Sequence, residues 1–300
     1  MESINLFWVQ LWPSKPTLTA ATLPSQTGRV IIVTGSTSGL GLALVQALYK
    51  AEATVFMAAR RESKAKAAIE TITTTTSTAT PGKLPGDPAT LPIQHTAQNL
   101  EPQLSINCVG PYLLTQLLAP ILVSTAQSPS TPPNSVRVIW TSSMLVDAWA
   151  PPEGIRPSDL DPPSANVNHS YALSKTGNWF LAVRLAKQLG GQGVVSITQN
   201  PGNLSTPIWD HAKRWIVWVT RPLYYPVDKG VCTLLWAGMS ENVTVQDGGG
   251  YAIPWGRWHP YPRKDLLEAI KDEEGQGDNR GRGYAKAFEE WYDKVSREFR

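Results

Sequence analysis

One short segment near the start of the chain restricts the possible folds more than any other. The β-branched run Val30–Val33 leads directly into Thr34–Gly41, whose sequence TGSTSGLG carries three glycines. Such a run is typical of a strand buried on both faces, and the leucines that follow at helical spacing predict a helix over Gly39–Ala51. Glycines between a strand and a helix N-terminus permit a tight turn and close approach of a diphosphate to backbone N–H groups. The segment therefore predicts an α/β fold with a phosphate-binding turn.

Other glycine motifs fit this turn less well. No Gly-Lys-Ser/Thr follows it, so it is not the P-loop of nucleoside triphosphatases. Thr37 stands where the GxSxG motif of serine hydrolases requires serine, and Ser143 has no evident histidine partner, which disfavours a hydrolase. A glycine-rich turn that binds no ligand is the remaining alternative.

The next segment indicates which dinucleotide the turn would hold. Thr54–Ala58 is a second predicted strand and Glu62–Thr71 a second helix, which together suggest a parallel βαβ unit. An acidic residue at the end of the second strand would accept hydrogen bonds from a ribose 2′-hydroxyl, but this strand ends in two alanines, Arg60 and Arg61. Guanidinium groups favour a 2′-phosphate, and hence NADP(H). The alternative is that both arginines begin a solvated helix.

The rest of the chain predicts a single Rossmann-type domain with a doubly wound parallel sheet. Residues 1–27 form an irregular lead-in, 28–262 the dinucleotide-binding domain, and 263–300 a charged helical extension whose charges we expect on solvated faces. Within the domain, 72–102 is rich in threonine and proline and is predicted to be an irregular loop. Structureless stretches of this length are unusual inside compact domains.

Composition excludes several classes of protein. With 42% hydrophobic residues the chain can bury a large core, and its net charge of +3 gives no support for a nucleic-acid partner. Two cysteines without a CxxC motif and four scattered histidines predict core thiols and no metal site. We find no run of about 18 apolar residues, which predicts no membrane-spanning helix, and no secretory signal, so we expect a cytoplasmic protein.

A tyrosine and a lysine four residues apart supply candidate acid–base chemistry. Tyr171 and Lys175 share one face of the helix predicted over Tyr171–Leu189. A nearby ammonium group stabilises a phenolate and lowers its pKa, and Ser143, at the end of the preceding strand, can hold a substrate oxygen. A YxxxK pair alone is common by chance, and an exposed Tyr and Lys on a helix is the plain alternative.

The order of these motifs resembles that of the short-chain dehydrogenase/reductase superfamily, and within it the retinol-dehydrogenase-like branch. The matching stretches are 28–71 and about 95–255. Ile106–Gly110 matches the helix that carries the family's catalytic asparagine. The resemblance implies four catalytic residues: Ser143, Tyr171, Lys175 and Asn107. With Arg60 added from the charge argument, the expected cofactor-binding residues are Gly35, Ser36, Thr37, Ser38, Gly39, Leu40, Gly41, Arg60, Asn107, Tyr171, Lys175, Pro201, Gly202 and Thr206.

The resemblance also implies a reaction, hydride transfer between NADP(H) and a small-molecule carbonyl or alcohol. Tyr171 would exchange the proton, and Lys175 would bind the nicotinamide ribose and lower the pKa of Tyr171. Ser143 would position the substrate oxygen, and Asn107 would support a water relay to Lys175. The cofactor supplies the hydride, while the protein supplies alignment and electrostatics.

Tryptophan and tyrosine residues gather where the family places its substrate-binding loop, in the stretch 208–225. They are Trp209, Trp215, Trp218, Tyr224 and Tyr225. An apolar cover of this kind suits a lipophilic substrate. A packed helix, or a patch that contacts a membrane or a partner, has equal weight.

The chain departs from the family pattern in 72–102. The family places there a third strand and a fourth strand that ends in Asn-Asn-Ala-Gly, and about 35 to 45 residues are missing by comparison with the doubly wound strand order. The fourth strand lies beside the first, so its loss makes the first and fifth strands pair directly or leaves backbone groups unpaired. Two hypotheses follow. The chain is either an active reductase whose sheet closes around the gap, or a truncated, catalytically impaired relative that acts as a binding protein or a non-functional isoform.

Overall fold

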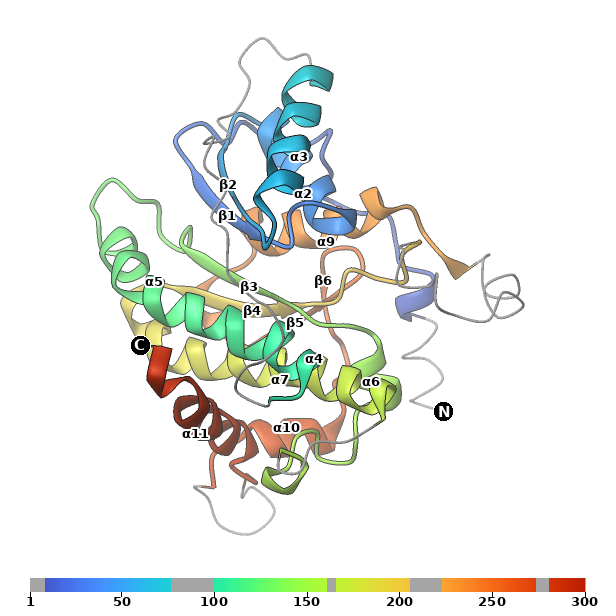
Figure 1. The fold of residues 1–300 in the computed structure, drawn as a ribbon, viewed down its shortest axis with the longest axis vertical. Helices are drawn as coiled ribbons and strands as arrows, with labels where there is room; N and C mark the ends of the chain where they lie inside the picture. Colours follow the sequence, from blue (N-terminus) through green and yellow to red (C-terminus); the bar gives the residue numbers. More distant parts are fainter. Residues whose placement is uncertain (1–8, 77–99, 161–165, 206–222, 274–280, 300) are drawn as a thin grey trace.

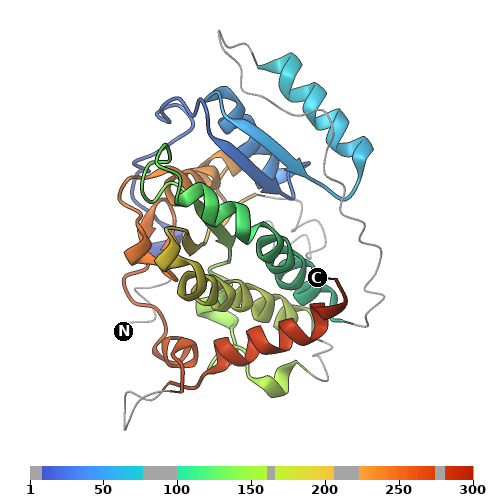
Figure 2. The same ribbon diagram turned by 90° about the vertical axis from the view of Figure 1, so that its left-hand side faces the viewer.

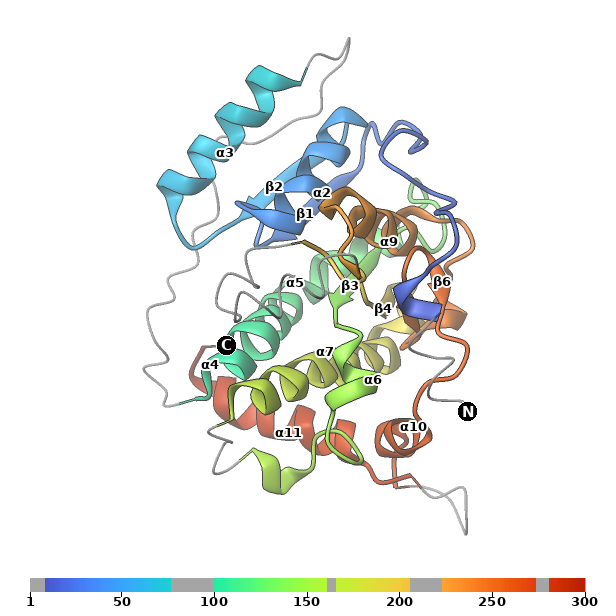
Figure 3. The ribbon, with the colours of Figure 1, turned by 90° about the vertical axis from the view of Figure 1, so that its right-hand side faces the viewer.

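Two separate parallel half-sheets form the centre of the structure (Figure 1). The computed structural model describes residues 9–76, 100–160, 166–205, 223–273 and 281–299. The first half-sheet holds β1 (Val30–Thr34) and β2 (Thr54–Ala58), paired in parallel. They are joined by α2 (Gly39–Lys50), and α3 (Glu62–Thr75) follows β2 at the outer edge of the molecule (Figure 3).

The second half-sheet has four strands in the order β3-β4-β5-β6. β3 (Arg137–Thr141), β4 (Val195–Gln199) and β5 (Tyr251–Ile253) are parallel, and β6 (Arg257–Trp258) turns back antiparallel to β5. All five residues of β4 are buried, as expected for a strand covered on both faces.

Helices cover the two faces of this half-sheet. α9 (Val227–Met239) packs with α2 on one face, and α7 (Val167–Leu189) with α5 (Gly110–Ala126) covers the other (Figures 1 and 2). Shorter elements connect them: α4 (Pro102–Leu104), a π-helical turn (Ser105–Val109) and α6 (Leu145–Trp149). The α/β Rossmann-type architecture and the single domain predicted from the sequence are confirmed, with helix and strand boundaries close to those expected.

The sheet is depleted in the way the missing residues imply. Among the described residues no backbone ladder joins β1 to β3, so the first and fifth strands of the family layout do not pair directly. On one face of the β1–β2 pair large apolar side chains are open to solvent, with Val30 66%, Ile32 45% and Phe56 41% exposed. Buried parallel sheets do not usually leave such a face uncovered.

The irregular segment 72–102 is shorter than expected. α3 continues to Thr75, and the hydroxyls of Thr73, Thr74 and Thr75 donate to carbonyl groups one turn back. Helical structure resumes at Pro102. The remaining part of the predicted loop, 77–99, lies outside the described residues.

The charged extension differs more from the expectation. α10 (Lys264–Ile270) and α11 (Tyr284–Ser296) form a further layer beyond α7 (Figure 1). Glu289 of α11 is 6% exposed and accepts hydrogen bonds from Arg184, Gln188 and Tyr112, each at 2.6 Å. The expectation of a solvated helix face was therefore wrong for Glu289. Its carboxylate can be buried because it forms an ion pair with the Arg184 guanidinium of α7.

One helical stretch, Pro102–Ala126, is long and apolar enough to cross a membrane by length and composition alone. Asn107 and Gln116 interrupt it, which is why the sequence contains no uninterrupted apolar run there. Its inner face packs on the protein through Cys108 and Tyr112, both fully buried. Both cysteines of the chain are buried free thiols, as expected, and burial raises the pKa of Cys108 to about 12.

Candidate active site

The turn between β1 and α2 has the geometry that a phosphate site requires. Gly35 and Gly39 have positive φ values of 62° and 52°, which side chains disfavour. A Cβ atom on Gly41 would overlap the carbonyl oxygen of Gly35, so only glycine allows this close crossing of the backbone. The buried Ser36 hydroxyl donates to the carbonyl of Ala58 at 3.4 Å and ties the turn to the end of β2.

The open side of the turn is free to receive a ligand. A Cβ atom at Gly35 or Gly39 would meet no atom within 4 Å, and Ser38 begins α2 without a side-chain cap. Uncapped N–H groups at a helix start attract anions. Arg60 is exposed two residues beyond Ala58, the residue that Ser36 contacts. The residues of this turn therefore fit a dinucleotide phosphate, with a guanidinium close by in the chain.

Tyr171 and Ser143 are brought together as the sequence predicts. Ser143 follows β3, and its hydroxyl accepts a hydrogen bond from the backbone of Leu145 at 3.2 Å. Tyr171 lies in the second turn of α7, half-buried. Burial raises the pKa of Tyr171 above its ordinary value, and a hydrogen bond with the Ser143 side chain acts in the opposite direction. The net pKa is raised, so the phenol is protonated at neutral pH.

Lys175 lies one turn after Tyr171, but its charge is directed elsewhere. Its ammonium donates to the carbonyl of Thr141 at 3.3 Å and lies 5.6 Å from the centre of the Tyr171 ring. Burial lowers the pKa of Lys175, while the Cys108 thiol acts in the other direction. The net pKa of Tyr171 is raised, so the lowering by Lys175 that the resemblance implies stays a prediction.

Asn107 also belongs to this cluster. It lies in the π-helical turn before α5, a kind of distortion that is frequent at functional sites. Its side-chain amide donates to the Ser174 hydroxyl at 2.9 Å, and Ser174 donates to the carbonyl of Tyr171 at the same distance. The four predicted catalytic residues thus meet at the carboxyl end of β3 and the first turns of α7.

The segment after β4 forms a second wall of the site. The Asn200 side chain accepts a hydrogen bond from the backbone of Gly202 at 2.9 Å. Gly202 has a φ of 94°, and a Cβ there would approach Pro254 to 3.2 Å, so this turn also requires glycine. Thr206 and the tryptophans Trp209, Trp215 and Trp218 lie outside the described residues.

Three residues of the site were missed by the sequence analysis. The Ser142 hydroxyl donates to the carbonyl of Lys175 at 2.8 Å, and Tyr251 donates to the carbonyl of Ser143 at 2.8 Å. Asn178 donates to the carbonyl of Thr141 at 2.8 Å. A signal was present for Asn178, which lies two helical turns after Tyr171.

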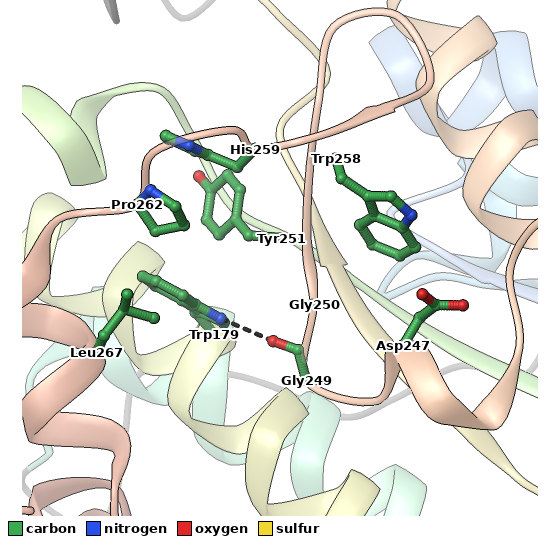
Figure 4. Close-up of a pocket in the computed structure, with 9 residues that line it drawn as sticks. All are labelled: Trp179, Asp247, Gly249, Gly250, Tyr251, Trp258, His259, Pro262 and Leu267. Carbon is green, nitrogen blue, oxygen red and sulfur yellow. Dashed lines mark hydrogen bonds between the residues drawn. The ribbon is translucent and has the colours of Figure 1, made fainter. Parts of the chain in front are cut away.

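A small cavity of about 250 Å³ lies behind this site and contains none of the predicted residues (Figure 4). Trp179, Tyr251 and Trp258 line it, and the Tyr251 ring packs edge-on between Trp179 and His259. Ligand sites usually have about 300–1,000 Å³. We therefore assign this cavity to the packing that holds Tyr251.

Comparisons with known proteins agree with this geometry. A family model described as short chain dehydrogenase matches residues 29–84, the segment that contains the phosphate turn. The fold is similar to that of an uncharacterised protein of Mycobacterium paratuberculosis, with a TM-score of 0.62, 20% identity and coverage of 93% of this chain and 97% of the other. It is also similar to RhlG of Pseudomonas aeruginosa, crystallised with NADP, with a TM-score of 0.54, 20% identity and coverage of 78% and 98%.

A relative in sequence extends the match to nearly the whole chain. The short-chain dehydrogenase/reductase iacJ of Pestalotiopsis fici is 33% identical over 336 aligned positions, which cover 98% of both proteins. Since 98% of these 300 residues is about 294, about 40 aligned positions have no residue in this chain. This number agrees with the gap expected from the sequence. The chain belongs to the short-chain dehydrogenase/reductase family.

Proposed function

We propose that the chain is an NADP(H)-dependent oxidoreductase that interconverts a carbonyl and an alcohol on a lipophilic small molecule. The observation that carries this proposal is the convergence of four residues at the carboxyl end of β3: Ser143 is hydrogen-bonded to Tyr171, Ser174 links Asn107 to the Tyr171 carbonyl, and Lys175 donates to Thr141. Family membership supports oxidoreductase chemistry. A cytoplasmic location is part of the same proposal.

Each residue then has a definite task. NADP(H), when bound, supplies or accepts the hydride. In the direction of reduction, the Tyr171 hydroxyl donates its proton to the substrate oxygen, which the Ser143 hydroxyl holds in place. The raised pKa of Tyr171 means that its hydroxyl carries this proton at neutral pH. The Lys175 ammonium, which donates to the Thr141 carbonyl, would hold the nicotinamide ribose. Asn107 donates to Ser174, the residue that precedes Lys175.

The cofactor preference rests on charge. Arg60 and Arg61 are exposed after β2, where an acidic side chain would select NAD(H). The complex of RhlG with NADP is consistent with this choice. An Arg60→Glu variant is expected to lose the preference for NADPH, because its carboxylate repels a 2′-phosphate.

Thermal unfolding with and without cofactor tests the proposal. At 100 times its Kd, a ligand that binds only the folded state adds about 2.7 kcal/mol, a shift of several degrees at about 2–4 °C per kcal/mol. We expect NADPH to produce this shift, NADH a smaller one, and NADPH to be oxidised with lipophilic aldehydes or ketones. No shift with either dinucleotide would refute the proposal.

A second candidate function is favoured by the split sheet. The chain would be a catalytically impaired relative that keeps the acid–base residues but does not hold a dinucleotide. The open edge of β1, which has no strand partner besides β2 among the described residues, and the roughly 40 missing positions support it. It predicts cooperative unfolding with no shift by NADPH, whereas measurable NADPH oxidation by the purified chain would exclude it.

A further inference from the structure

A glutamine from the N-terminal lead-in lies inside the protein, next to the site. Gln10 is 3% exposed, although residues 1–27 carry no periodic pattern that predicts burial. Its side-chain amide nitrogen donates to Asp147 Oδ2 at 2.8 Å, and its amide oxygen accepts from Asn200 Nδ2 at 2.7 Å. Both polar atoms of the side chain are therefore satisfied by residues more than 130 positions away.

The partners of Gln10 are themselves fixed. His259 Nε2 lies 3.0 Å from the same Asp147 oxygen. The backbone N–H of Tyr261 donates to His259 Nδ1 at 3.2 Å, so Nε2 carries the hydrogen and donates to Asp147. Asp147 accepts from both sides, and the Gln10 amide has only one orientation that satisfies this network.

The backbone around Gln10 is anchored as well. Arg257 donates to the carbonyl of Val9 at 2.9 Å, and the Tyr225 hydroxyl donates to the carbonyl of Leu11 at 2.8 Å. Arg257 belongs to β6, and Tyr225 is the last residue of the stretch 208–225 expected to contain the substrate loop. Residues 9–11 are therefore hydrogen-bonded to α6, to the turn after β4, to β6 and to Tyr225.

The two residues joined by Gln10 come from opposite walls. Asp147 lies in α6, four residues after Ser143, and Asn200 begins the turn that ends at Gly202. These segments follow the neighbouring parallel strands β3 and β4 at the same edge of the sheet. The distance between the walls decides how a substrate oxygen held by Ser143 lies relative to a group held by the Gly202 turn.

We infer that Gln10 is a positioning residue, a cross-brace that fixes the Ser143–Asp147 segment against the Asn200–Gly202 turn. Its consequence for catalysis rests on the proposed function, whereas its consequence for the turn does not. Glutamine suits this position because one side chain must donate to a carboxylate and accept from an amide at once. Leucine has similar volume and supplies neither bond.

Hydrogen exchange combined with steady-state kinetics tests the brace on the full chain. In Gln10→Leu, we expect backbone amides of 200–205 to exchange about tenfold faster or more, because the turn loses its anchor. Exchange in α2 should not change. If the chain turns over, kcat should fall about 10- to 100-fold, as a small misplacement of reacting groups can cause, with KM for NADPH within about twofold. The same substitution at the exposed Gln127 is the matched control.

A double-mutant cycle separates positioning from simple loss of stability. Asn200→Ala removes the amide that donates to Gln10, so the turn already lacks its bond to the brace. If Gln10 acts on the turn through Asn200, adding Gln10→Leu should raise exchange at 200–205 by less than about threefold further, because the effects of coupled sites are not additive.

The outcomes are separable. Unchanged exchange at 200–205 in Gln10→Leu, or additive effects of Gln10→Leu and Asn200→Ala on that exchange, would overturn the brace. A Gln10→Leu protein with a lower Tm but unchanged exchange and kcat would show an ordinary core residue and also overturn it. Absence of NADPH binding in the parent chain would refute the proposed function alone, since the exchange measurement still decides the brace.

Discussion

The half of the molecule built on β3–β6 is covered on both faces, whereas the described residues cover only one face of the half built on β1 and β2. Every residue of β4 is buried between α7 and α9, but Val30 and Ile32 of β1 are 66% and 45% exposed. The acid–base residues belong to the complete half, and the phosphate turn belongs to the incomplete one. The comparison teaches that intact motifs indicate a complete fold only for the half of the sheet that carries them, and not for the whole proposed site.

The difference has a simple physical origin. α2 and α9 cover the inner face of β1 and β2, but no described helix covers the face that carries Ile32 and Phe56. The roughly 40 positions present in the Pestalotiopsis fici relative and absent here are enough for a strand and a helix. The predictions below test how far this difference controls function, from the largest expected effect to the smallest.

Tyr171→Phe tests the chemistry of the complete half. Loss of a positioned acid–base group costs about 10²- to 10⁴-fold in rate, so kcat/KM for carbonyl reduction should fall by that factor. The NADPH-induced thermal shift should persist, because the ring remains. Tyr261→Phe, at a 69% exposed tyrosine, is the matched control. Equal rates in the parent and Tyr171→Phe would remove Tyr171 from the mechanism.

Matched isoleucines compare the stability of the two halves directly. Ile197 of β4 is fully buried and Ile32 of β1 is 45% exposed. Truncation of a buried isoleucine to alanine costs about 2–5 kcal/mol, whereas exposed substitutions usually stay within about 0.5 kcal/mol. Urea unfolding of Ile197→Ala and Ile32→Ala measures both. Similar losses at the two positions would mean that β1 is covered in solution.

Gly41→Val tests the incomplete half. The added side chain collides with the Gly35 carbonyl and deforms the phosphate turn, so the expected stabilisation by NADPH of about 2.7 kcal/mol at 100 times Kd should vanish. Gly238→Ala, in α9 with open space around its Cβ position, controls for glycine replacement in general. An unchanged shift in Gly41→Val would show that the cofactor does not use this turn.

Asp272→Asn tests the outer layer and should have the smallest effect. Burial raises the pKa of Asp272, but the hydrogen bond and charge of Lys187, with Arg184, outweigh it, and the net pKa is lowered. A carboxyl group whose pKa is lowered by folding stabilises the folded state at pH values above its unfolded pKa, near 3.9. This stabilisation is lost as the pH falls through the pKa of the folded state. At pH 7 the partly exposed carboxylate should contribute under about 1 kcal/mol. A difference between parent and variant that persists at pH 2 would contradict this assignment.

Local patterns predicted most of the fold. For Val30–Thr34, Gly39–Lys50 and Thr54–Ala58 the apolar pattern is strong, and the predicted boundaries agree with the structure within one residue. The burial of Glu289 was not predictable in this way, because its partner Arg184 lies 105 positions earlier and only tertiary packing joins them. Gln10 was missed for the same reason.

The sequence predicted which residues form the candidate site, but not how their side chains are oriented. The spacing of Tyr171 and Lys175 indicates a shared helix face, yet it does not say where a flexible ammonium group points. In the structure it points to Thr141. The direction of the Tyr171 pKa shift depends on burial by segments distant in the sequence, which spacing alone does not report.

The separation of β1 from β3 has a consequence for handling the protein. Along β1 and along β3, one row of backbone N–H and C=O groups lacks a strand partner among the described residues. Such edges accept any extended segment that approaches, including the same strand of a second molecule. Yield and monodispersity should therefore fall steeply with protein concentration, and dilute refolding should recover more monomer than refolding at high concentration.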